Sequence, residues 1–473
     1  MIGKQAVNPY LPNWEYVPDG EPHVFGDRVY VYGSHDFFGG DVYCMGDYVC
    51  WSAPVNSLGD WRYEGVIYRK DQDPHNGDLQ GNLYAPDVTR GPDGRYYLYY
   101  VLSTWGVVSV AVSDTPAGAY EFLGYVRYPD GARLGEREGD EPQFDPGVLT
   151  EGNRTYLYTG FCGYGDMGRH GAMCTVLGPD MLTVIEAPRF VAPGVMYAGG
   201  TGFEGHAFFE APSIRKKDGL YWFIYSSIKF HELCYAVSRE PAGGFEYKGV
   251  LVSGCDMGIG TYKPAEKPMY YTANNHGSME KIGDDWYIFY HRHTNGTNYS
   301  RQGCFEKLTF REDGMANQAE ITSCCGIKPL EGRGEYPAYI ACHLFTDTEV
   351  TYVPWSGWMD DRFPKITQEI RDGGRGIGYI ANMRDSATAG FKYFDCRGVK
   401  KVTVRTKGYA SGTVEIKLKW DGEAVGSVPV GYANVWKETT AEVNIPDGVH
   451  SLYFTFRGQG HLQFAAFRLE TEA

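Results

Sequence analysis

The sequence lacks the features that mark several large classes of protein. It has no run rich in lysine and arginine, and its 44 basic residues against 59 acidic ones leave a formal net charge of −15. An acidic chain without a basic patch is a poor partner for nucleic acid or an anionic membrane. Nor does it contain an apolar stretch of the roughly 18 residues that a membrane-spanning helix needs. We therefore expect neither nucleic acid nor a membrane as a partner.

Other absences concern compartment and cofactors. The N-terminal residues MIGKQAVNPYLPNWEY have no apolar core of signal-peptide length, which favours a cytoplasmic protein. The eleven cysteines are scattered through predicted strands without CxxC spacing. This pattern indicates reduced thiols in the core rather than disulfides or zinc ligands. Because no phosphate-binding glycine loop or other cofactor motif occurs, no cofactor is expected to be required.

The chain also lacks long helical periodicity, whereas it is rich in turn and strand formers. It contains 62 glycines, 38 tyrosines, 24 phenylalanines and 10 tryptophans. This composition predicts an all-β protein. A length of 473 residues exceeds what one hydrophobic core usually serves, so at least two domains are expected.

One sequence pattern returns five times. A polar residue opens a short apolar strand, a turn follows, and an aromatic strand begins 10 or 11 positions after the opener. Successive openers lie 68, 58, 65 and 66 residues apart. The five openers are Asp19, Asp87, Asp145, Glu210 and His276.

A repeat of this length with strands at its start is typical of a four-stranded β-propeller blade with long loops. The first strand of each blade lines the central channel, so five equivalent residues converge on the axis. The sequence therefore predicts a five-bladed β-propeller with four carboxylates and one histidine at one end of the channel.

A second all-β unit follows the repeats. Residues 326–344 are rich in proline and glycine and predict a linker between a propeller at 1–325 and a second domain at 345–473. The segments KKVTVRTKG, GTVEIKLKW, AVGSVPV, ETTAEVNI, HSLYFTFRG and HLQFAAFRLE predict strands, and apolar and polar residues alternate in VTVRTK and VEIKLKW. Alternation of this kind predicts a β-sandwich with a jelly-roll-like arrangement.

Crowded carboxylates at one place have a chemical consequence. Collecting like charges costs free energy and separates their pKa values, so that one group stays protonated while another is ionised. A hydrolase needs this division between a general acid and a general base. With no nucleotide, haem or zinc motif, and with many aromatic residues, the pattern indicates glycoside hydrolysis.

The motifs YAPD, FDPGVL, FEAPSI and NNHGS, in this order, resemble glycoside hydrolase family 43 over residues 8 to about 315. The resemblance implies a five-bladed propeller and an inverting mechanism. It implies that Asp19 is the general base, that Glu210 is the general acid, and that Asp145 raises the pKa of the acid.

The resemblance also implies contacts with the substrate. Asp87 is expected to position the site or bind a sugar hydroxyl, and Arg301 to reach the pocket from the last blade. His276 matches a central histidine, near which a calcium ion is an option, although no metal is required. Phe37 stands in a loop with a second aromatic residue and is a candidate for stacking on a sugar at the pocket mouth.

The C-terminal segments GVHSLYFTFRGQG and HLQFAAFRLE resemble carbohydrate-binding module family 6. The whole chain is then expected to be an exo-glycosidase that removes terminal α-L-arabinofuranose or β-D-xylose from oligosaccharides. Loops at 36–41 and 255–272 are long enough to close a pocket, which favours exo over endo action. The alternatives are an endo-arabinanase and a non-catalytic sugar-binding propeller. Oligomeric state is not predicted.

Overall fold

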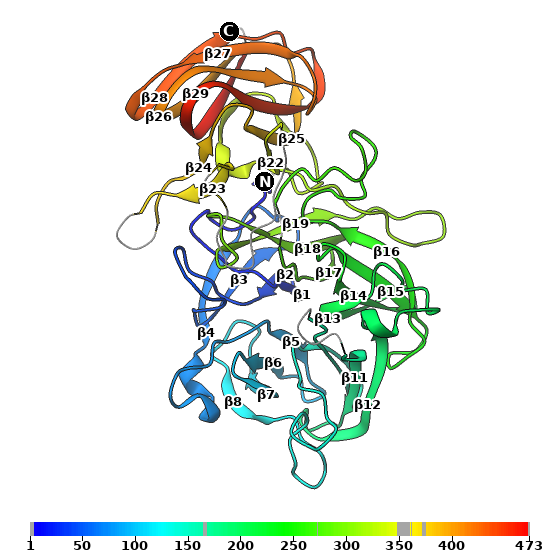
Figure 1. The fold of residues 1–473 in the computed structure, drawn as a ribbon. Helices are drawn as coiled ribbons and strands as arrows, with labels where there is room; N and C mark the ends of the chain where they lie inside the picture. The colour runs from blue at the N-terminus through cyan, green and yellow to red at the C-terminus, as the bar shows by residue number, and fades with distance from the viewer. Residues whose placement is uncertain are drawn as a thin grey trace.

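The protein folds into a ring of β-sheets followed by a second β domain (Figure 1). A computed structural model describes residues 4–163, 168–271, 273–347, 360, 362–370 and 375–471. Within these residues the helices are single turns that cannot cross a membrane. They are η1 (Lys70–Gln72), η2 (Pro74–Asn76), η3 (Val195–Tyr197) and η4 (Ala338–Ile340). The predicted all-β fold class is confirmed.

Five antiparallel sheets form the blades, and the first strand of each lies nearest the middle of the ring (Figure 1). Blades one to four have four strands each, and the described residues of blade five have three. The strands, blade by blade, are β1 (Glu21–Phe25), β2 (Arg28–Tyr32), β3 (Tyr48–Pro54) and β4 (Arg62–Tyr68); β5 (Asp87–Arg90), β6 (Tyr96–Leu102), β7 (Trp105–Ser113) and β8 (Glu121–Tyr125); β9 (Gly147–Glu151), β10 (Arg154–Thr159), β11 (Gly171–Leu177) and β12 (Val184–Pro193); β13 (Phe208–Lys217), β14 (Leu220–Ser227), β15 (Leu233–Ser238) and β16 (Glu246–Val252); β17 (Met279–Ile282), β18 (Asp285–His293) and β19 (Arg301–Lys307).

The aromatic strand of each blade is buried on both faces, which explains its nearly continuous apolar sequence. Strand β14 is an example. Its residues Tyr221 and Phe223 pack in the core between blades three and four, whereas Trp222 and Ile224 pack between blades four and five. Because successive side chains of a strand point to opposite faces, one aromatic strand supplies both cores. The repeated Tyr-rich strands are therefore the inter-blade packing of the propeller.

Both ends of the propeller segment close the ring. Strand β19 is the third strand of blade five, and the N-terminal residues lie against it. The amide of Tyr10 donates to the carbonyl of Gly303, and the side chain of Asn8 both donates to and accepts from the backbone of Phe305. A parallel bridge joins Gly20 before β1 to Gly277 before β17. These contacts join the first blade to the last.

The second domain is one large sheet system. Its strands are β20 (Leu330–Glu331), β21 (Gly334–Pro337), β22 (His343–Phe345), β23 (Lys365–Gln368), β24 (Gly378–Met383), β25 (Thr388–Cys396), β26 (Val399–Lys417), β27 (Ala424–Val430), β28 (Ala433–Glu442) and β29 (Gly448–Thr471). The expected strands at 400–408 and 412–420 are parts of one long strand, β26, because β29 pairs with it along nearly its whole length.

The stretch 326–344 is more than a connector. Strands β20 and β21 and the first residues of β22 lie in it and pair with β25 and β29 of the second domain. The outer ends of the two predicted domains, residues 1 and 473, lie outside the described part. One continuous core then joins the two domains, and it contains Ile288 of blade five together with Ile366 and Phe391 of the second domain. All eleven cysteines are buried, as predicted for thiols of the core.

Candidate active site

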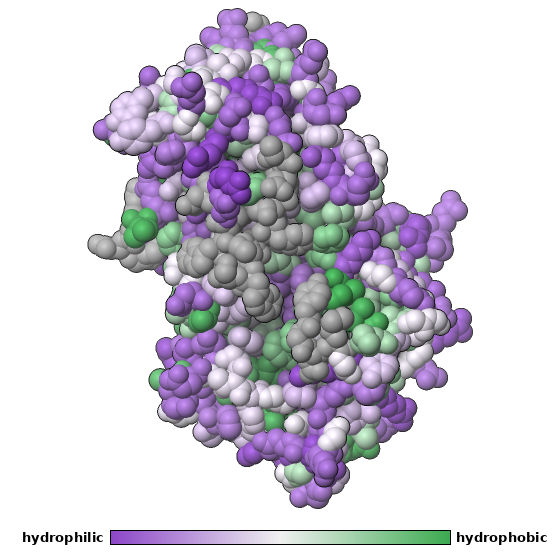
Figure 2. Space-filling view, in the orientation of Figure 1, coloured by the Kyte–Doolittle hydropathy of each residue, from purple (hydrophilic) through white to green (hydrophobic). Residues whose placement is uncertain are grey.

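A cavity of about 720 Å³ lies on the propeller. In Figure 2 hydrophobic surface gathers in a recess over the middle of the propeller, below a largely hydrophilic second domain. The lining residues are Asp19, Tyr43, Cys44, Tyr84, Ala85, Phe144, Asp145, Phe161, Phe209, Glu210, Ile228, Lys229, Phe230, His231, Ala273, Asn274, His276, Asn298 and Arg301. The two loops predicted to close the pocket, 36–41 and 255–272, lie just before lining residues in the chain: Tyr43 and Cys44 follow the first, and Ala273 and Asn274 follow the second. Residue 272 is outside the described part.

Four of the five repeat openers line this cavity, and the backbone at three of them is unusual. Asp19 and Asp145 have φ values of 58° and 47°, just ahead of β1 and β9. Ala211, with φ 62°, follows Glu210 at a register shift in β13. Non-glycine residues rarely adopt this left-handed conformation, and such positions gather at functional sites. The conformation turns these side chains toward one space.

Asp19 is held as a carboxylate. Its Oδ1 lies 3.0 Å from Nη1 of Arg301 and 3.3 Å from Nδ1 of His291. Burial alone would raise the pKa of Asp19, but the guanidinium of Arg301 and the hydrogen bond with His291 hold this pKa well below its usual range. Asp19 is therefore ionised at neutral pH and has the charge that a general base needs.

Arg301 is nearly fully buried and is committed to two carboxylates. Besides Asp19, its Nε donates to Oδ2 of Asp36 at 2.8 Å and its Nη2 donates to Oδ1 of Asp36 at 3.1 Å. The planar guanidinium thus forms a bidentate pair that fixes its orientation. The structure places Arg301 on the cavity wall, where its remaining Nη1 donates to Asp19.

Glu210 and Asp145 have the opposite electrostatic environment. Burial and the charge of Asp19 raise the pKa of Glu210 to about 8. Burial and the charges of Glu210 and Asp19 raise the pKa of Asp145 well above its usual range, although the amide of Ala211 donates to it. The described residues provide neither carboxylate with a cationic partner as close as Arg301 is to Asp19. This pair therefore retains a proton at neutral pH while Asp19 does not.

Two histidines of the cavity are neutral. Burial lowers the pKa of His276 to about 4 and that of His231 to about 4. The Nδ1 of His276 lies 3.6 Å from Oδ2 of Asp145, and the Nδ1 of His231 lies 3.8 Å from Oε1 of Glu210. Neither imidazole adds a positive charge that would ionise the neighbouring carboxyl group, so both leave the proton on the carboxyl pair.

Asp87 and Phe37 are not among the residues that line the cavity, and their predicted contacts with a sugar stay predictions. Asp87 is fully buried as the first residue of β5. Its Oδ1 contacts Nε2 of His23 at 2.6 Å and its Oδ2 accepts from the amide of Val148 at 2.7 Å. Hydrogen bonds within the fold thus occupy both carboxyl oxygens of Asp87, which favours its predicted positioning role. Phe37 is 45% exposed and packs its ring edge against His35.

A second polar cluster fills the propeller around Arg215, which sequence reasoning missed. Arg215 donates to Oε2 of Glu21 at 2.9 Å and to Oε2 of Glu280 at 3.0 Å. It also lies 3.4 Å from Nε2 of His23, whose other contact is Asp87. Side chains alternate between the two faces of a strand, so the sequence EPHVF places Glu21 and His23 on one face of β1. That spacing was the sequence feature from which this polar cluster could have been predicted.

A calcium ion near His276 stays a prediction. Calcium takes roughly six to eight oxygen ligands. Near His276 the protein offers Oδ2 of Asp145 and Oε1 of Glu21, which is 3.9 Å from Nε2 of His276 and is buried without a hydrogen-bond partner in the described residues. These two oxygens are fewer than the six to eight that calcium takes, so the described side chains supply only part of such a site. Such an ion would supply local positive charge, and activity after exhaustive chelation tests for it.

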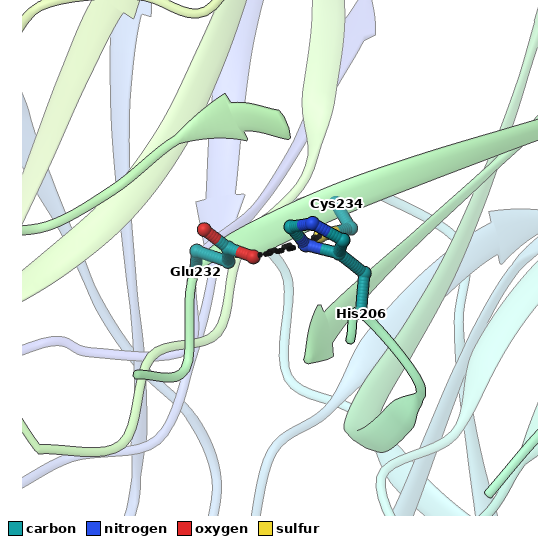
Figure 3. Close-up of side chains that lie close together, drawn as sticks. All are labelled: His206, Glu232 and Cys234. Carbon is teal, nitrogen blue, oxygen red and sulfur yellow. Dashed lines mark hydrogen bonds and ion pairs between the residues drawn. The ribbon is translucent and has the colours of Figure 1, made fainter. Parts of the chain in front are cut away.

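The turn between β14 and β15 forms one wall of the cavity with residues 228–231. Phe230 and His231 have φ values of 59° and 52°, so this turn needs an anchor. Figure 3 shows that anchor: the next residue, Glu232, contacts Nδ1 of His206 at 2.5 Å, and Cys234 lies beside them. The wall that carries His231 is therefore tied to the loop before β13.

The trio in Figure 3 also combines atom types that bind zinc. The Sγ of Cys234 is 3.9 Å from Nδ1 of His206 and 3.7 Å from Oε1 of Glu232. Ligands at about 2.0–2.3 Å from one tetrahedral zinc ion lie roughly 3.3 Å or more apart. The 2.5 Å contact of His206 with Glu232 is much shorter and is the spacing of a hydrogen bond. We read the trio as an anchor of the turn.

Comparison with known proteins agrees with this geometry. The family profile "Glycosyl hydrolases family 43" matches residues 17–316, and "Carbohydrate binding module (family 6)" matches residues 363–471. The chain is 64% identical over 471 residues to a xylosidase/arabinosidase of Thermoclostridium stercorarium, covering 99% of this chain and 100% of the relative. It is 28% identical to a xylosidase/arabinosidase of Bacteroides ovatus, over 60% of this chain and 87% of the relative.

Among solved structures, an arabinoxylan arabinofuranohydrolase from Bacillus subtilis matches with a TM-score of 0.53 at 20% identity, covering 99% of this chain and 98% of the other. That likeness concerns the fold. A five-bladed propeller with three carboxylates on one cavity defines a glycoside hydrolase. The chain belongs to glycosyl hydrolase family 43, and its second domain matches carbohydrate-binding module family 6.

Proposed function

We propose that this protein is an inverting exo-glycosidase that releases terminal α-L-arabinofuranose or β-D-xylose from oligosaccharides derived from arabinoxylan. The observation that carries the proposal is that three carboxyl groups line one cavity and only Asp19 is paired with Arg301. Asp19 is paired with Arg301 and ionised, whereas the pKa of Glu210 is raised to about 8. An inverting glycosidase needs one carboxylate to activate water and one carboxylic acid to protonate the leaving oxygen.

In the proposed step a water molecule attacks the anomeric carbon while the glycosidic C–O bond breaks. Asp19 accepts a proton from the water, and Glu210 gives its proton to the leaving oxygen. The products are a free pentose of inverted configuration and a shortened oligosaccharide. Exchange of one proton with solvent restores both groups. The two carboxyl groups are expected to lie about 6.5–9.5 Å apart, which leaves room for the water.

The sugar class rests on relatives. The Thermoclostridium stercorarium relative, which matches over the whole length of this chain, is a xylosidase/arabinosidase. The aromatic rings of Phe144, Phe161 and Phe209 line the cavity, and such faces stack on the apolar side of a sugar ring. We infer that a terminal pentose is the natural occupant.

Hydrolysis of 4-nitrophenyl α-L-arabinofuranoside and 4-nitrophenyl β-D-xyloside, side by side, tests the proposal, with Asp19→Ala as the blank. If the wild type releases nitrophenol from one or both glycosides and Asp19→Ala does not, the proposal is supported. The relative rates then rank the two sugars. Proton NMR of the first product should show the inverted anomer, and a retained anomer would contradict the mechanism. Release from linear arabinan alone would indicate an endo-arabinanase, and no release at all a sugar-binding propeller.

The acid role has a separate test. Glu210→Ala should lose roughly 10²- to 10⁴-fold in kcat on xylobiose, because that leaving group must be protonated. The loss on a 4-nitrophenyl glycoside should be much smaller, because nitrophenolate leaves without a proton. Equal losses on both substrates would contradict Glu210 as the acid. Glu204→Ala, at an exposed glutamate in the loop before β13, is the control.

A further inference from the structure

Strand β23 of the second domain reaches the propeller beside the cavity. The carbonyl of Ile366 accepts from the amide of Asn295 at 2.6 Å. The hydroxyl of Thr367 donates to Oδ1 of Asn295 at 2.8 Å. Main chain and side chain of one propeller residue are therefore both held by two successive residues of the sandwich. Ile366 and Thr367 are buried, so these hydrogen bonds are shielded from water.

Asn295 belongs to the loop that leads into Arg301. This loop, residues 294–300, joins β18 to β19 and is closed by a hydrogen bond from the amide of Thr294 to the carbonyl of Ser300. Asn295 and Gly296 have φ values of 57° and 66°. A non-glycine residue in this conformation persists only where its surroundings hold it. The same loop carries Asn298 into the cavity wall.

The next residue of β23 holds the other half of the charge pair. The hydroxyl of Tyr16 donates to Oε1 of Gln368 at 2.8 Å, and both side chains are buried. The carbonyl of Tyr16 accepts from the amide of Asp36, the bidentate partner of Arg301. Tyr16 also stands three residues before Asp19 in the chain. Both segments that meet in the Asp19–Arg301 pair are thus tied to one strand of the second domain.

We propose that β23 is a positioning element of the active site, which sets Arg301 against Asp19 through Thr367 and Gln368. The second domain, which matches carbohydrate-binding module family 6, then contributes to the catalytic centre. Because Arg301 orients Asp19 and lowers its pKa, a small displacement of the loop misplaces the Asp19 carboxylate and changes its pKa before it disturbs the fold. The inference deepens the proposed function and rests on it for its kinetic test.

The test is the double variant Thr367→Val/Gln368→Leu, which keeps shape and removes both polar contacts. On a 4-nitrophenyl pentoside we expect kcat/KM to fall about tenfold, since misplacement by a fraction of an ångström is costly. The acidic limb of the pH profile should move to higher pH, because a displaced Arg301 lets the pKa of Asp19 rise. Thr367→Ser/Gln368→Leu restores one hydroxyl and should recover part of the loss.

The matched control is Thr403→Val, at a buried threonine whose hydroxyl contacts Thr440 and Glu470 within the sandwich. It should leave kcat/KM and the pH profile unchanged. If the double variant behaves like this control while the wild type is active, the positioning role is overturned and the proposed function stands.

A readout without substrate separates the two ideas further. Hydrogen exchange of peptides covering residues 10–19 and 294–300 should become faster in the double variant and stay unchanged in Thr403→Val. Unchanged exchange in the double variant overturns the positioning role, whether or not the wild type hydrolyses pentosides. A wild type that hydrolyses no pentoside overturns the proposed function, independently of the exchange result.

Discussion

The propeller holds two neighbouring clusters of carboxyl side chains, called here the cavity group and the buried group. The cavity group comprises Asp19, Asp145 and Glu210, and the buried group comprises Glu21, Asp87 and Glu280 around Arg215. His276 lies between the groups, 3.6 Å from Asp145 and 3.9 Å from Glu21. Each group has one arginine. The two groups differ in which carboxyl groups the arginine leaves without a cationic partner. They also differ in whether a substrate can reach them.

In the cavity group Arg301 is committed to Asp19 and Asp36, so the proton stays on Asp145 and Glu210. In the buried group Arg215 lies between Glu21 and Glu280, and the hydrogen bonds of Asp87 are with His23 and the backbone. Burial raises the pKa of Glu21 to about 7 and that of Asp87 to about 6. Perturbed pKa values occur in both groups, so they do not by themselves identify a catalytic site; the cavity does.

The largest effect is expected for Asp19 in the cavity group. Asp19→Ala should lower kcat by roughly 10³-fold on natural and activated substrates alike, because water is no longer deprotonated. Steady-state kinetics on a 4-nitrophenyl pentoside measure this loss. Asp27→Ala, at the exposed turn after β1, is the control and should be neutral. If Asp19→Ala kept a tenth of the activity, another base would be required.

The buried group should respond in stability. Arg215→Met removes the guanidinium from Glu21 and Glu280 and should cost about 3–5 kcal/mol of unfolding free energy. The pKa of Glu21, which burial already raises to about 7, would then rise further above its unfolded value, so the stability of the variant should fall as pH rises between the unfolded and the folded pKa of Glu21. Denaturant unfolding at about pH 5 and about pH 8 measures this difference.

Arg90→Met, at an exposed arginine of β5, is the control and should change stability by less than about 0.5 kcal/mol. A loss for Arg215→Met that did not depend on pH would contradict the electrostatic account of the buried group.

The pH profile sharpens the assignment inside the cavity. The value of kcat/KM should fall as pH rises through about 8, where Glu210 loses its proton. On the acid side, kcat/KM should stay constant down to a pH well below the usual pKa range of an aspartate, because Arg301 and His291 lower the pKa of Asp19. Asp145→Asn removes one member of the coupled pair and should move the basic limb to lower pH by about one unit. An unmoved limb would show that Asp145 does not tune the acid.

The smallest effect on activity is expected for Asp87→Asn. The variant keeps the shape of the side chain but turns an amide toward the backbone N–H of Val148, which should cost about 1–3 kcal/mol of stability. Activity per folded molecule should stay within about twofold of wild type, because Asp87 is outside the cavity. A hundredfold drop in kcat/KM without loss of stability would restore the predicted contact with a sugar hydroxyl.

Much of the architecture was determined by the sequence alone. The spacing of five openers and their aromatic strands specifies five blades, because a strand buried on both faces must be apolar throughout. The same spacing brings Asp19, Asp145, Glu210 and His276 to one cavity, since equivalent positions of a closed ring converge on its axis. These are local, repeated properties, and a periodic sequence records them.

Only the tertiary structure decided which polar residues meet. Asp87 shares the opener's place in the repeat, yet it stands inside β5 with its oxygens bound by the fold, whereas Asp19 precedes its strand with a left-handed backbone. Arg215 meets Glu21 across 194 residues of sequence. The contact of β23 with the loop before Arg301 likewise joins two domains. Such pairings follow from ring closure and domain packing, and no spacing along the chain encodes them.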